Sequence, residues 1–406
     1  MNQAALEKTV WFRNDSARDA FSIKSDTELF SPDRIRAVRR FHKSVPRFQP
    51  TPLVSLPQLA GYLGVSSIHV KDESYRCGLN AFKVLGASHG IARALAQRLG
   101  MEGDTLDLSP FTDPDMRQAM RSVTLVTATD GNHGRAVAWM AEQLECRSVV
   151  FMPRGSSPLR VESIRQHGAK ASVIDGNYDD AVERAAGLAE KNGWLLIQDT
   201  ARPGYEEIPA WIMQGYAVMI DEACEQMGNQ VPSHVFAQCG VGSFAAAIQA
   251  YLIQKYGHER PVFVVVEPTR AACYFKSITS EARLPVRVHG DMDTIMAGLA
   301  CGEPSRSAWE ILKDYADMFV ACPDAVAMRG MRALGNPLPG DAKIISGESG
   351  AVTLGLTMEI AENDALKPLR EELGMNAASR LLFFSTEGDT DPEAYRRIVG
   401  APGRGT

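Results

Sequence analysis

Short runs of apolar residues alternate along this chain with longer segments in which apolar residues recur every three or four positions. The short runs predict strands at 67–70, 123–127, 148–152, 171–174, 195–198, 234–238, 262–266 and 381–385, and segments such as 86–98 and 179–191 predict helices. This alternation is typical of parallel strands joined by crossover helices. Because the strands are continuous runs of apolar residues, we expect helices on both faces of the sheets. The predicted fold class is α/β.

Length and composition indicate an ordinary globular protein. The chain has 406 residues, of which 45% are hydrophobic and 23% charged, and this length suggests about two or three folding units. Its net charge is -6 and its basic residues are scattered, so the sequence gives no sign of binding nucleic acid or an anionic membrane. We therefore expect a small-molecule partner.

Two further features bear on the location of the protein. Residues 235–254 carry no charge, but they include Gln, Ser and Gly, which favours a buried strand, loop and helix over a membrane span. The N-terminus has no apolar signal segment, and the seven cysteines include no C-x-x-C pair. Cys273 and Cys301 could face each other, although free thiols are the expectation in a reducing compartment. We predict a cytoplasmic protein without a metal site.

A glycine-rich loop follows the strand predicted at 234–238 and precedes a helix-like segment. The loop consists of Gly240, Val241, Gly242 and Ser243. A strand, a glycine turn and a helix N-terminus in this order direct backbone N–H groups at one point, which suits a phosphate. A plain tight turn is the alternative. The pattern also fits a dinucleotide fingerprint completed by Ala245, with Glu267 as the ribose-binding carboxylate, so a nicotinamide-dependent oxidoreductase is a rival hypothesis.

Two other loops carry candidate chemistry. Lys83 opens a helix-like segment, where an apolar site could lower its pKa and allow the neutral amine to form a Schiff base with an aldehyde. A surface lysine on an amphipathic helix is the alternative. Asp130, Gly131 and Asn132 form a turn after the strand predicted at 123–127, and their side chains would face a ligand unless Asp130 only caps the helix. His133 is expected to support this turn.

Nine segments of the chain occur in the order found in a known group of enzymes. They are KDESYRCGLNAFKVLGAS, TATDGNHGRAVAW, GNYDDAV, QDTARPGY, IPAWIMQGY, GVGSF, IMAGLACGEP, IISGESGAV and FSTEGDTD. With these segments the sequence resembles the fold type II pyridoxal-phosphate enzymes, the tryptophan synthase β and threonine dehydratase group, and within that group the diaminopropionate ammonia-lyases. The resemblance covers nearly the whole chain.

The resemblance implies an architecture and a cofactor. Two α/β domains with mostly parallel twisted sheets would hold pyridoxal 5'-phosphate between them. A large domain with an N-terminal arm would comprise residues 1–83 and 191–406, and a small domain would comprise residues 84–190. A homodimer is also implied.

The resemblance also assigns roles to residues around that cofactor. Lys83 would form the Schiff base, and the loop 240–243 would hold the phosphate. Asn132 would approach the phenolic oxygen of the cofactor. The pyridine nitrogen would meet the hydroxyl of Ser385 or Thr386, between which the sequence does not decide.

Three carboxylates are assigned to substrate chemistry. Asp130 stands where dehydratases of the group commonly have serine or threonine, and it could pair with a β-ammonium group and take the α-proton from the face opposite Lys83. Asp199 would bind the substrate amine or tune Asp130, because two nearby carboxylates disfavour joint ionisation. Glu348 is expected near the substrate, although a helix cap would look the same.

The function predicted on this basis is α,β-elimination of D- and L-2,3-diaminopropionate to pyruvate and two molecules of ammonia. The substrate would be a small amino acid. A serine or threonine dehydratase, including the D-serine type, is the nearest alternative, and the oxidoreductase described above is the rival from another class.

Overall fold

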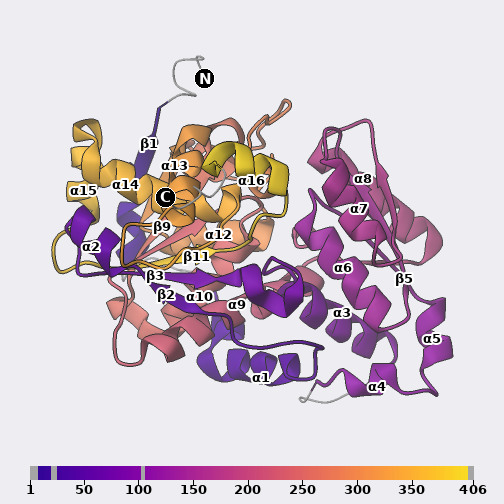
Figure 1. The fold of residues 1–406 in the computed structure, drawn as a ribbon. Helices are drawn as coiled ribbons and strands as arrows, with labels where there is room; N and C mark the ends of the chain where they lie inside the picture. The colour runs from indigo at the N-terminus through magenta and orange to yellow at the C-terminus, as the bar shows by residue number, and fades with distance from the viewer. Residues whose placement is uncertain (1–7, 20–24, 102–105, 401–406) are drawn as a thin grey trace, which may run out of the picture.

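The computed structural model describes residues 8–19, 25–101 and 106–400, which form a larger and a smaller lobe (Figure 1). The larger lobe contains a seven-stranded sheet in the order β1-β10-β9-β8-β11-β3-β2, and the smaller lobe a four-stranded sheet in the order β6-β5-β4-β7. The strands are β1 (Val10–Arg13), β2 (Leu53–Ser55), β3 (Ser67–Asp72), β4 (Thr124–Ala128), β5 (Arg147–Met152), β6 (Lys170–Val173), β7 (Leu195–Leu196), β8 (His234–Gln238), β9 (Val262–Pro268), β10 (Met318–Cys322) and β11 (Arg380–Ser385).

Neighbouring strands are parallel except at the two edges of the larger sheet, where β1 pairs antiparallel with β10 and β2 antiparallel with β3. The predicted α/β class with mostly parallel sheets is therefore confirmed. All eight predicted strands are present, seven of them with shifted ends and β8 with the predicted bounds, whereas β1, β2 and β10 were not predicted. The division into domains at 83 and 190 stays a prediction, and β7, which pairs with β4 of the smaller sheet, lies beyond residue 190.

Helices fill the connections between the strands. The longer ones are α1 (Pro32–His42), α3 (Val84–Arg98), α6 (Asn132–Gln143), α7 (Pro158–Arg165), α8 (Tyr178–Asn192), α9 (Glu207–Met227), α10 (Ser243–Tyr256), α12 (Arg306–Tyr315), α13 (Asp324–Gly335), α14 (Glu348–Glu362) and α16 (Pro392–Val399). The shorter ones are α2 (Pro57–Leu63), α4 (Ser109–Thr112), α5 (Arg117–Ser122), α11 (Cys273–Thr279) and α15 (Lys367–Leu373). The N-terminal arm contains β1 and α1.

Both faces of the seven-stranded sheet are covered. Alternate residues of β8 belong to different cores: Val235 and Ala237 pack in the core that includes α3, α9 and α10, and Phe236 packs in the core that includes α13 and α14. This alternation follows from the two-residue repeat of a strand. It also explains the uncharged residues 235–254, which form β8, a loop and most of α10, as predicted.

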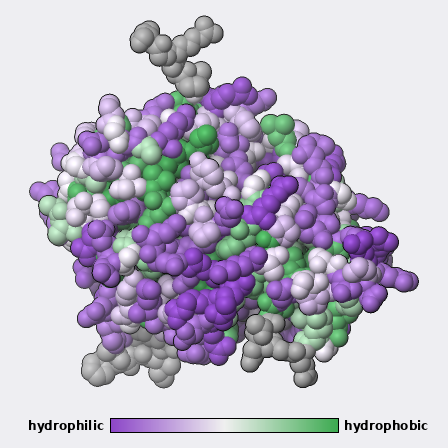
Figure 2. Space-filling model, turned by 60° about the horizontal axis from the view of Figure 1, so that its bottom comes forward, coloured by the Kyte–Doolittle hydropathy of each residue, from purple (hydrophilic) through white to green (hydrophobic). Residues whose placement is uncertain are grey.

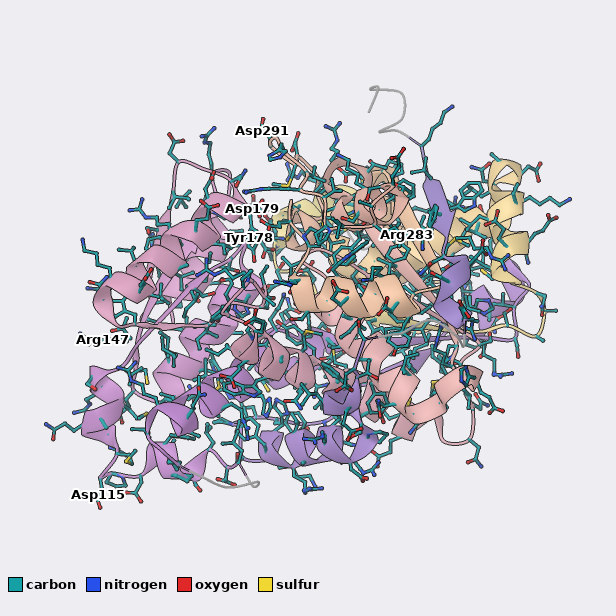
Figure 3. All side chains as sticks on the ribbon, turned by 180° about the vertical axis from the view of Figure 1, so that it is seen from behind. Asp115, Arg147, Tyr178, Asp179, Arg283 and Asp291 are labelled. Carbon is teal, nitrogen blue, oxygen red and sulfur yellow. The ribbon has the colours of Figure 1, made fainter. Side chains whose placement is uncertain are left out.

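The carboxyl ends of β3, β8 and β11 lie at one edge of the larger sheet, because these strands are parallel neighbours. In doubly wound folds this edge is where ligands bind. Figure 3 shows Tyr178 and Asp179, at the start of α8, on the side of the smaller lobe that faces the larger one. Hydrophilic side chains cover most of the face in Figure 2, with apolar ones in narrow areas between them. No helix within the described ranges is long and apolar enough to cross a membrane.

Candidate active site

A cavity lies beside the carboxyl ends of β4 in the smaller sheet and of β8 and β11 in the larger one. Its walls bring together most of the predicted site residues, including Lys83, Asp130, Asn132, Asp199, Thr386 and the loop Gly240, Val241, Gly242 and Ser243. Ser385 and Glu348 are not among the residues that line it. The sequence segments that carry these side chains are far apart in the chain, so the cavity exists only in the folded protein.

Lys83 immediately precedes α3, and its Nζ lies 2.5 Å from Oδ2 of Asp199. The same carboxylate oxygen accepts a hydrogen bond of 3.2 Å from Tyr216 of α9. Burial alone would lower the pKa of Lys83, but the attraction of Asp199 outweighs it and raises that pKa above its usual value. Burial likewise opposes ionisation of Asp199, yet Lys83 lowers the pKa of Asp199 to about 2. The expectation of a depressed lysine pKa is therefore wrong for the cofactor-free site.

Two glycines allow α9 to approach α3 closely enough for this contact. A Cβ on Gly86 would lie 2.4 Å from a ring carbon of Tyr216, and a Cβ on Gly215 would lie 2.2 Å from the carbonyl oxygen of Leu85. Neither position has room for a side chain. The close crossing places the Tyr216 hydroxyl at Asp199.

The glycine-rich loop joins the end of β8 to α10, which begins at Ser243. Gly242 has φ +96°, and a Cβ there would lie 1.9 Å from the hydroxyl oxygen of Tyr274, which donates a hydrogen bond of 2.9 Å to the carbonyl of Val241. Glycine is therefore required both by its backbone and by its neighbour. The Ser243 hydroxyl donates to the carbonyl of Asp199. The loop thus presents backbone N–H groups and the N-terminus of α10 to the cavity, next to the Lys83 pair.

Glu267 does not occupy the position of a ribose-binding carboxylate. It is fully buried at the end of β9, where its two oxygens accept hydrogen bonds of 2.8 and 2.7 Å from the backbone N–H groups of Tyr274 and Phe275. Burial raises the pKa of Glu267 to about 8. This carboxyl group accepts hydrogen bonds from the first turn of α11 and does not line the cavity. The geometry therefore contradicts the oxidoreductase hypothesis.

Asn132, Thr386 and Glu387 also line the cavity. Nδ2 of Asn132, at the start of α6, donates a hydrogen bond to Oε2 of Glu387. The Thr386 hydroxyl accepts one of 2.8 Å from Gln238 Nε2. Ser385 is fully buried, with its hydroxyl 3.4 Å from the carbonyl oxygen of Glu387. Of the two candidate residues, Thr386 lines the cavity and Ser385 does not.

Asp130 stands where this cavity meets a second, outer cavity that is also lined by Arg160 and Glu348. Burial raises the pKa of Asp130, against the attraction of Arg160 and Lys83. Glu348 begins α14, with its Oε2 3.9 Å from the Arg160 guanidinium, and burial together with Glu387 raises its pKa to about 7. Glu348 therefore lies on the approach to the site rather than beside Lys83.

Other sequence expectations can be placed on the structure. His133 supports its turn, because its Nε2 lies 2.8 Å from the carbonyl oxygen of Ile197. Cys273 and Cys301 are free and buried thiols, and Cys301 lines the cavity. Among the described residues, no group of three or more His, Cys, Asp or Glu side chains could hold a metal ion.

Four residues of the site were not assigned a role from the sequence: Tyr216, Gln238, Arg160 and Glu387. Tyr216 and Glu387 lie in IPAWIMQGY and FSTEGDTD, two of the nine segments that occur in the family order. This position was the sequence signal that could have identified them. Gln238 ends the predicted strand 234–238. Arg160 gave no signal, because a single arginine on a short helix has no distinguishing pattern.

The residues present fit pyridoxal phosphate. Four buried polar atoms of residues that line the cavity have no hydrogen-bond partner within the described residues, namely His133 Nδ1, Gln238 Oε1, Ser349 Oγ and Glu387 Oε1. They accompany a lysine amine for the aldehyde, a helix N-terminus for the phosphate and the Thr386 hydroxyl for a ring nitrogen. A polar, anionic, aldehyde-bearing ring matches this set of donors and acceptors.

Comparisons with known proteins agree with this chemistry. The family described as "Pyridoxal-phosphate dependent enzyme" matches residues 46–370. The diaminopropionate ammonia-lyase of Salmonella typhimurium is 43% identical over 97% of this chain and 98% of its own length. The crystal structure of the Escherichia coli enzyme with an aminoacrylate-PLP azomethine intermediate has a TM-score of 0.88 at 42% identity, covering 97% of each chain, and that of its D-serine complex has 0.86 at 41% and the same coverage. The chain belongs to the pyridoxal-phosphate-dependent enzymes and, among them, to the diaminopropionate ammonia-lyase family.

Proposed function

We propose that this protein eliminates ammonia from 2,3-diaminopropionate, in both its D and L forms. The observation that carries the proposal is that an amine and a separate carboxylate, Lys83 and Asp130, line one cavity with a phosphate-binding loop. Two proton acceptors on different walls suit two substrate enantiomers. The relatives reported above support the choice of substrate.

Lys83 and Asp130 are the proposed bases of the reaction. When bound, pyridoxal phosphate supplies an electron sink that acidifies the α-carbon of the substrate. Lys83 Nζ accepts the α-proton of one enantiomer, and a carboxylate oxygen of Asp130 accepts that of the other, D, enantiomer. The raised pKa of Asp130 makes its carboxylate a stronger base than an exposed aspartate.

Asp199 holds the proton on Lys83 while the amine is free, through their 2.5 Å contact. Asp130 would also attract the β-ammonium group of the substrate, which leaves as ammonia when its C–N bond breaks. The enamine product then reacts with one water molecule to give pyruvate and the second ammonia. The elimination and the hydrolysis together therefore need no oxidant or reductant.

Around the cofactor we assign Asn132 to the phenolic oxygen, Thr386 to the pyridine nitrogen and the loop 240–243 to the phosphate. Ser385 then acts only by supporting the turn through Glu387. Glu348, paired with Arg160, would meet the substrate on its way through the outer cavity. These roles rest on the family resemblance, and the residues that line each cavity support them.

Elimination of serine is the second candidate, because a solved structure of the E. coli relative contains D-serine. Pyruvate formation measured with D- and L-diaminopropionate and with D- and L-serine separates the two. Faster turnover of diaminopropionate supports the proposal, and turnover of serine alone overturns it.

We further infer a homodimer acting in the cytoplasm. All seven cysteines are free, six of them buried, which fits a reducing compartment. The dimer rests on the family resemblance. Sedimentation of the purified protein measures the oligomeric state, and fractionation of cells measures the compartment.

A further inference from the structure

Glu387 is a buried carboxylate in the cavity wall for which the proposed reaction has no use. Its side chain is 3% exposed and follows Thr386 directly in the chain. One carboxylate oxygen accepts the hydrogen bond from Asn132 Nδ2, and the other has no partner within the described residues. Burial disfavours the charged form of the neighbouring Arg160, but the attraction of Glu387 outweighs it and raises the pKa of Arg160, so this guanidinium balances the buried carboxylate.

The position of Glu387 is fixed from several sides. Its backbone forms a β-bridge with Ala81, two residues before Lys83, and its carbonyl accepts a hydrogen bond of 2.9 Å from the N–H of Gly347. Its side chain lies against Gly347, where a Cβ would be 2.8 Å from Cγ of Glu387. These contacts hold Glu387 in position beside Asn132.

The chemistry of the pair determines how the Asn132 amide is turned. An ionised carboxylate only accepts hydrogen bonds, so Asn132 must present its Nδ2 to Glu387 and not its carbonyl oxygen. One N–H of that nitrogen is used, and the second N–H of the same nitrogen remains for another acceptor in the cavity. Without the carboxylate, either end of the amide could face the cavity.

We propose that Glu387 is a positioning residue that orients the Asn132 amide, so that Asn132 donates an N–H to the phenolic oxygen of bound pyridoxal phosphate. This inference rests on the proposed function, because it assumes the cofactor in this cavity. A carbonyl oxygen in place of the N–H would repel an anionic phenolic oxygen. The orientation of the amide therefore determines whether this contact is attractive or repulsive.

The pair also joins the two lobes. Glu387 follows β11 of the seven-stranded sheet, and Asn132 begins α6, which packs on β4 and β5 of the four-stranded sheet. The Asn132–Glu387 hydrogen bond therefore connects the two lobes across the cavity.

Glu387→Gln tests the proposal, because it keeps the size of the side chain but can offer its own N–H to the Asn132 carbonyl. A hydrogen bond donated to the phenolic oxygen stabilises its deprotonated form. We expect Glu387→Gln to weaken pyridoxal-phosphate binding about five- to tenfold and to raise the pH midpoint of the visible absorption band of the loaded protein. Equilibrium dialysis and a spectral pH titration measure the two effects.

Asp389→Asn is the matched control. Asp389 lies in the same segment and accepts a hydrogen bond of 3.1 Å from the Asn80 amide, so this variant removes one charge from an equivalent contact outside the cavity lining. We expect unchanged affinity and an unchanged pH midpoint. The same shifts in both variants would show a general effect of charge and overturn the proposal.

The double variant Asn132→Ala with Glu387→Gln shows whether Glu387 acts through Asn132. We expect Glu387→Gln to change neither quantity further when Asn132 is already alanine. An equal effect in both backgrounds, or no effect in the single variant, overturns the proposal. If Glu387→Gln does not fold, Glu387→Asp replaces it, because the shorter carboxylate withdraws from Asn132 with the charge retained. A wild-type protein that binds no pyridoxal phosphate would instead refute the proposed function.

Discussion

Lys83 and Asp199 form a buried ion pair, with 2.5 Å between Nζ and Oδ2, although 116 positions separate them in the chain. Only 2% of the Asp199 side chain and 18% of the Lys83 side chain are exposed. Because the cavity shields the pair from water, each partner sets the protonation state of the other. The amine that is to attack an aldehyde is therefore held protonated until the pair opens.

Asp199→Asn should lower the pKa of Lys83, since burial is then opposed only by the remaining attractions, including that of Asp130. The rate at which apo-protein forms its Schiff base with added pyridoxal phosphate depends on the neutral amine. We expect its pH profile to shift to lower pH by roughly one unit or more. Stopped-flow absorbance measures the profile, and Tyr216→Phe, which leaves the carboxylate in place, is the control with a smaller shift. An unshifted Asp199→Asn profile would contradict the assignment.

The same pair predicts how the stability of the apo-protein depends on pH. The pKa of Asp199 is lowered to about 2 in the folded state, so the folded protein binds fewer protons than the unfolded chain between that value and the ordinary pKa of about 3.9. The stabilisation is present above pH 4 and is lost as the pH falls towards 2, by roughly 2 kcal/mol. Urea unfolding across this range measures it. The loss should be smaller in Asp199→Asn.

Lys83→Ala should abolish the visible band of the cofactor complex and reduce turnover by on the order of a thousandfold or more, because no other amine lines the cavity among the described residues. Lys343→Ala, at an exposed position, should change neither quantity. Absorbance and pyruvate formation are the measurements. A Lys83→Ala protein that keeps both would refute the role of this lysine.

Asp130→Asn should reduce kcat/KM for D-diaminopropionate by roughly a hundredfold or more, and affect the L enantiomer less, because only one face loses its base. Cofactor binding should persist, since Lys83 and the phosphate loop are intact. Asp291→Asn, a change at the outer cavity, is the control. If Asp130→Asn turns over each enantiomer at the wild-type rate, Asp130 has only a structural role in its turn.

Gly242→Ala should impair cofactor binding strongly, because the new methyl group meets the Tyr274 hydroxyl and the backbone has φ +96°. Gly257→Ala is the matched control, since Gly257 also has positive φ, at +56°, but nothing lies within 4 Å of a Cβ there. The control should lose only about 1–2 kcal/mol of unfolding free energy and keep its affinity for pyridoxal phosphate. Denaturant unfolding and dialysis separate steric from backbone effects.

The sequence predicted the parts of the fold that local patterns determine. The strand 234–238 was predicted with its observed bounds, because burial on both faces makes all five residues apolar or neutral. The edge strands β1 and β2 were missed, since they are only partly buried and carry weak apolar patterns. The strand β10 is fully buried, but its short apolar run directly follows α12, so periodicity alone does not separate it from the helix.

For the site, the motifs identified which residues meet but not how they meet. The contacts Lys83–Asp199 and Asn132–Glu387 join segments on different strands and helices, and the net pKa of a buried amine depends on the partner that folding brings to it. This is why the predicted direction of the Lys83 pKa was wrong. Glu387 stood in a quoted segment, yet its role depends on the amide across the cavity.

The close crossing of α3 and α9 gives the site a weakness that lies outside the cavity. Gly86 and Gly215 touch neither cofactor nor substrate, but a single methyl group at either position would push the helices apart and carry Tyr216 away from Asp199. The distance between these two helices thus affects the protonation of Lys83. A substitution at either glycine is expected to change the pKa of Lys83 although it lies outside the cavity.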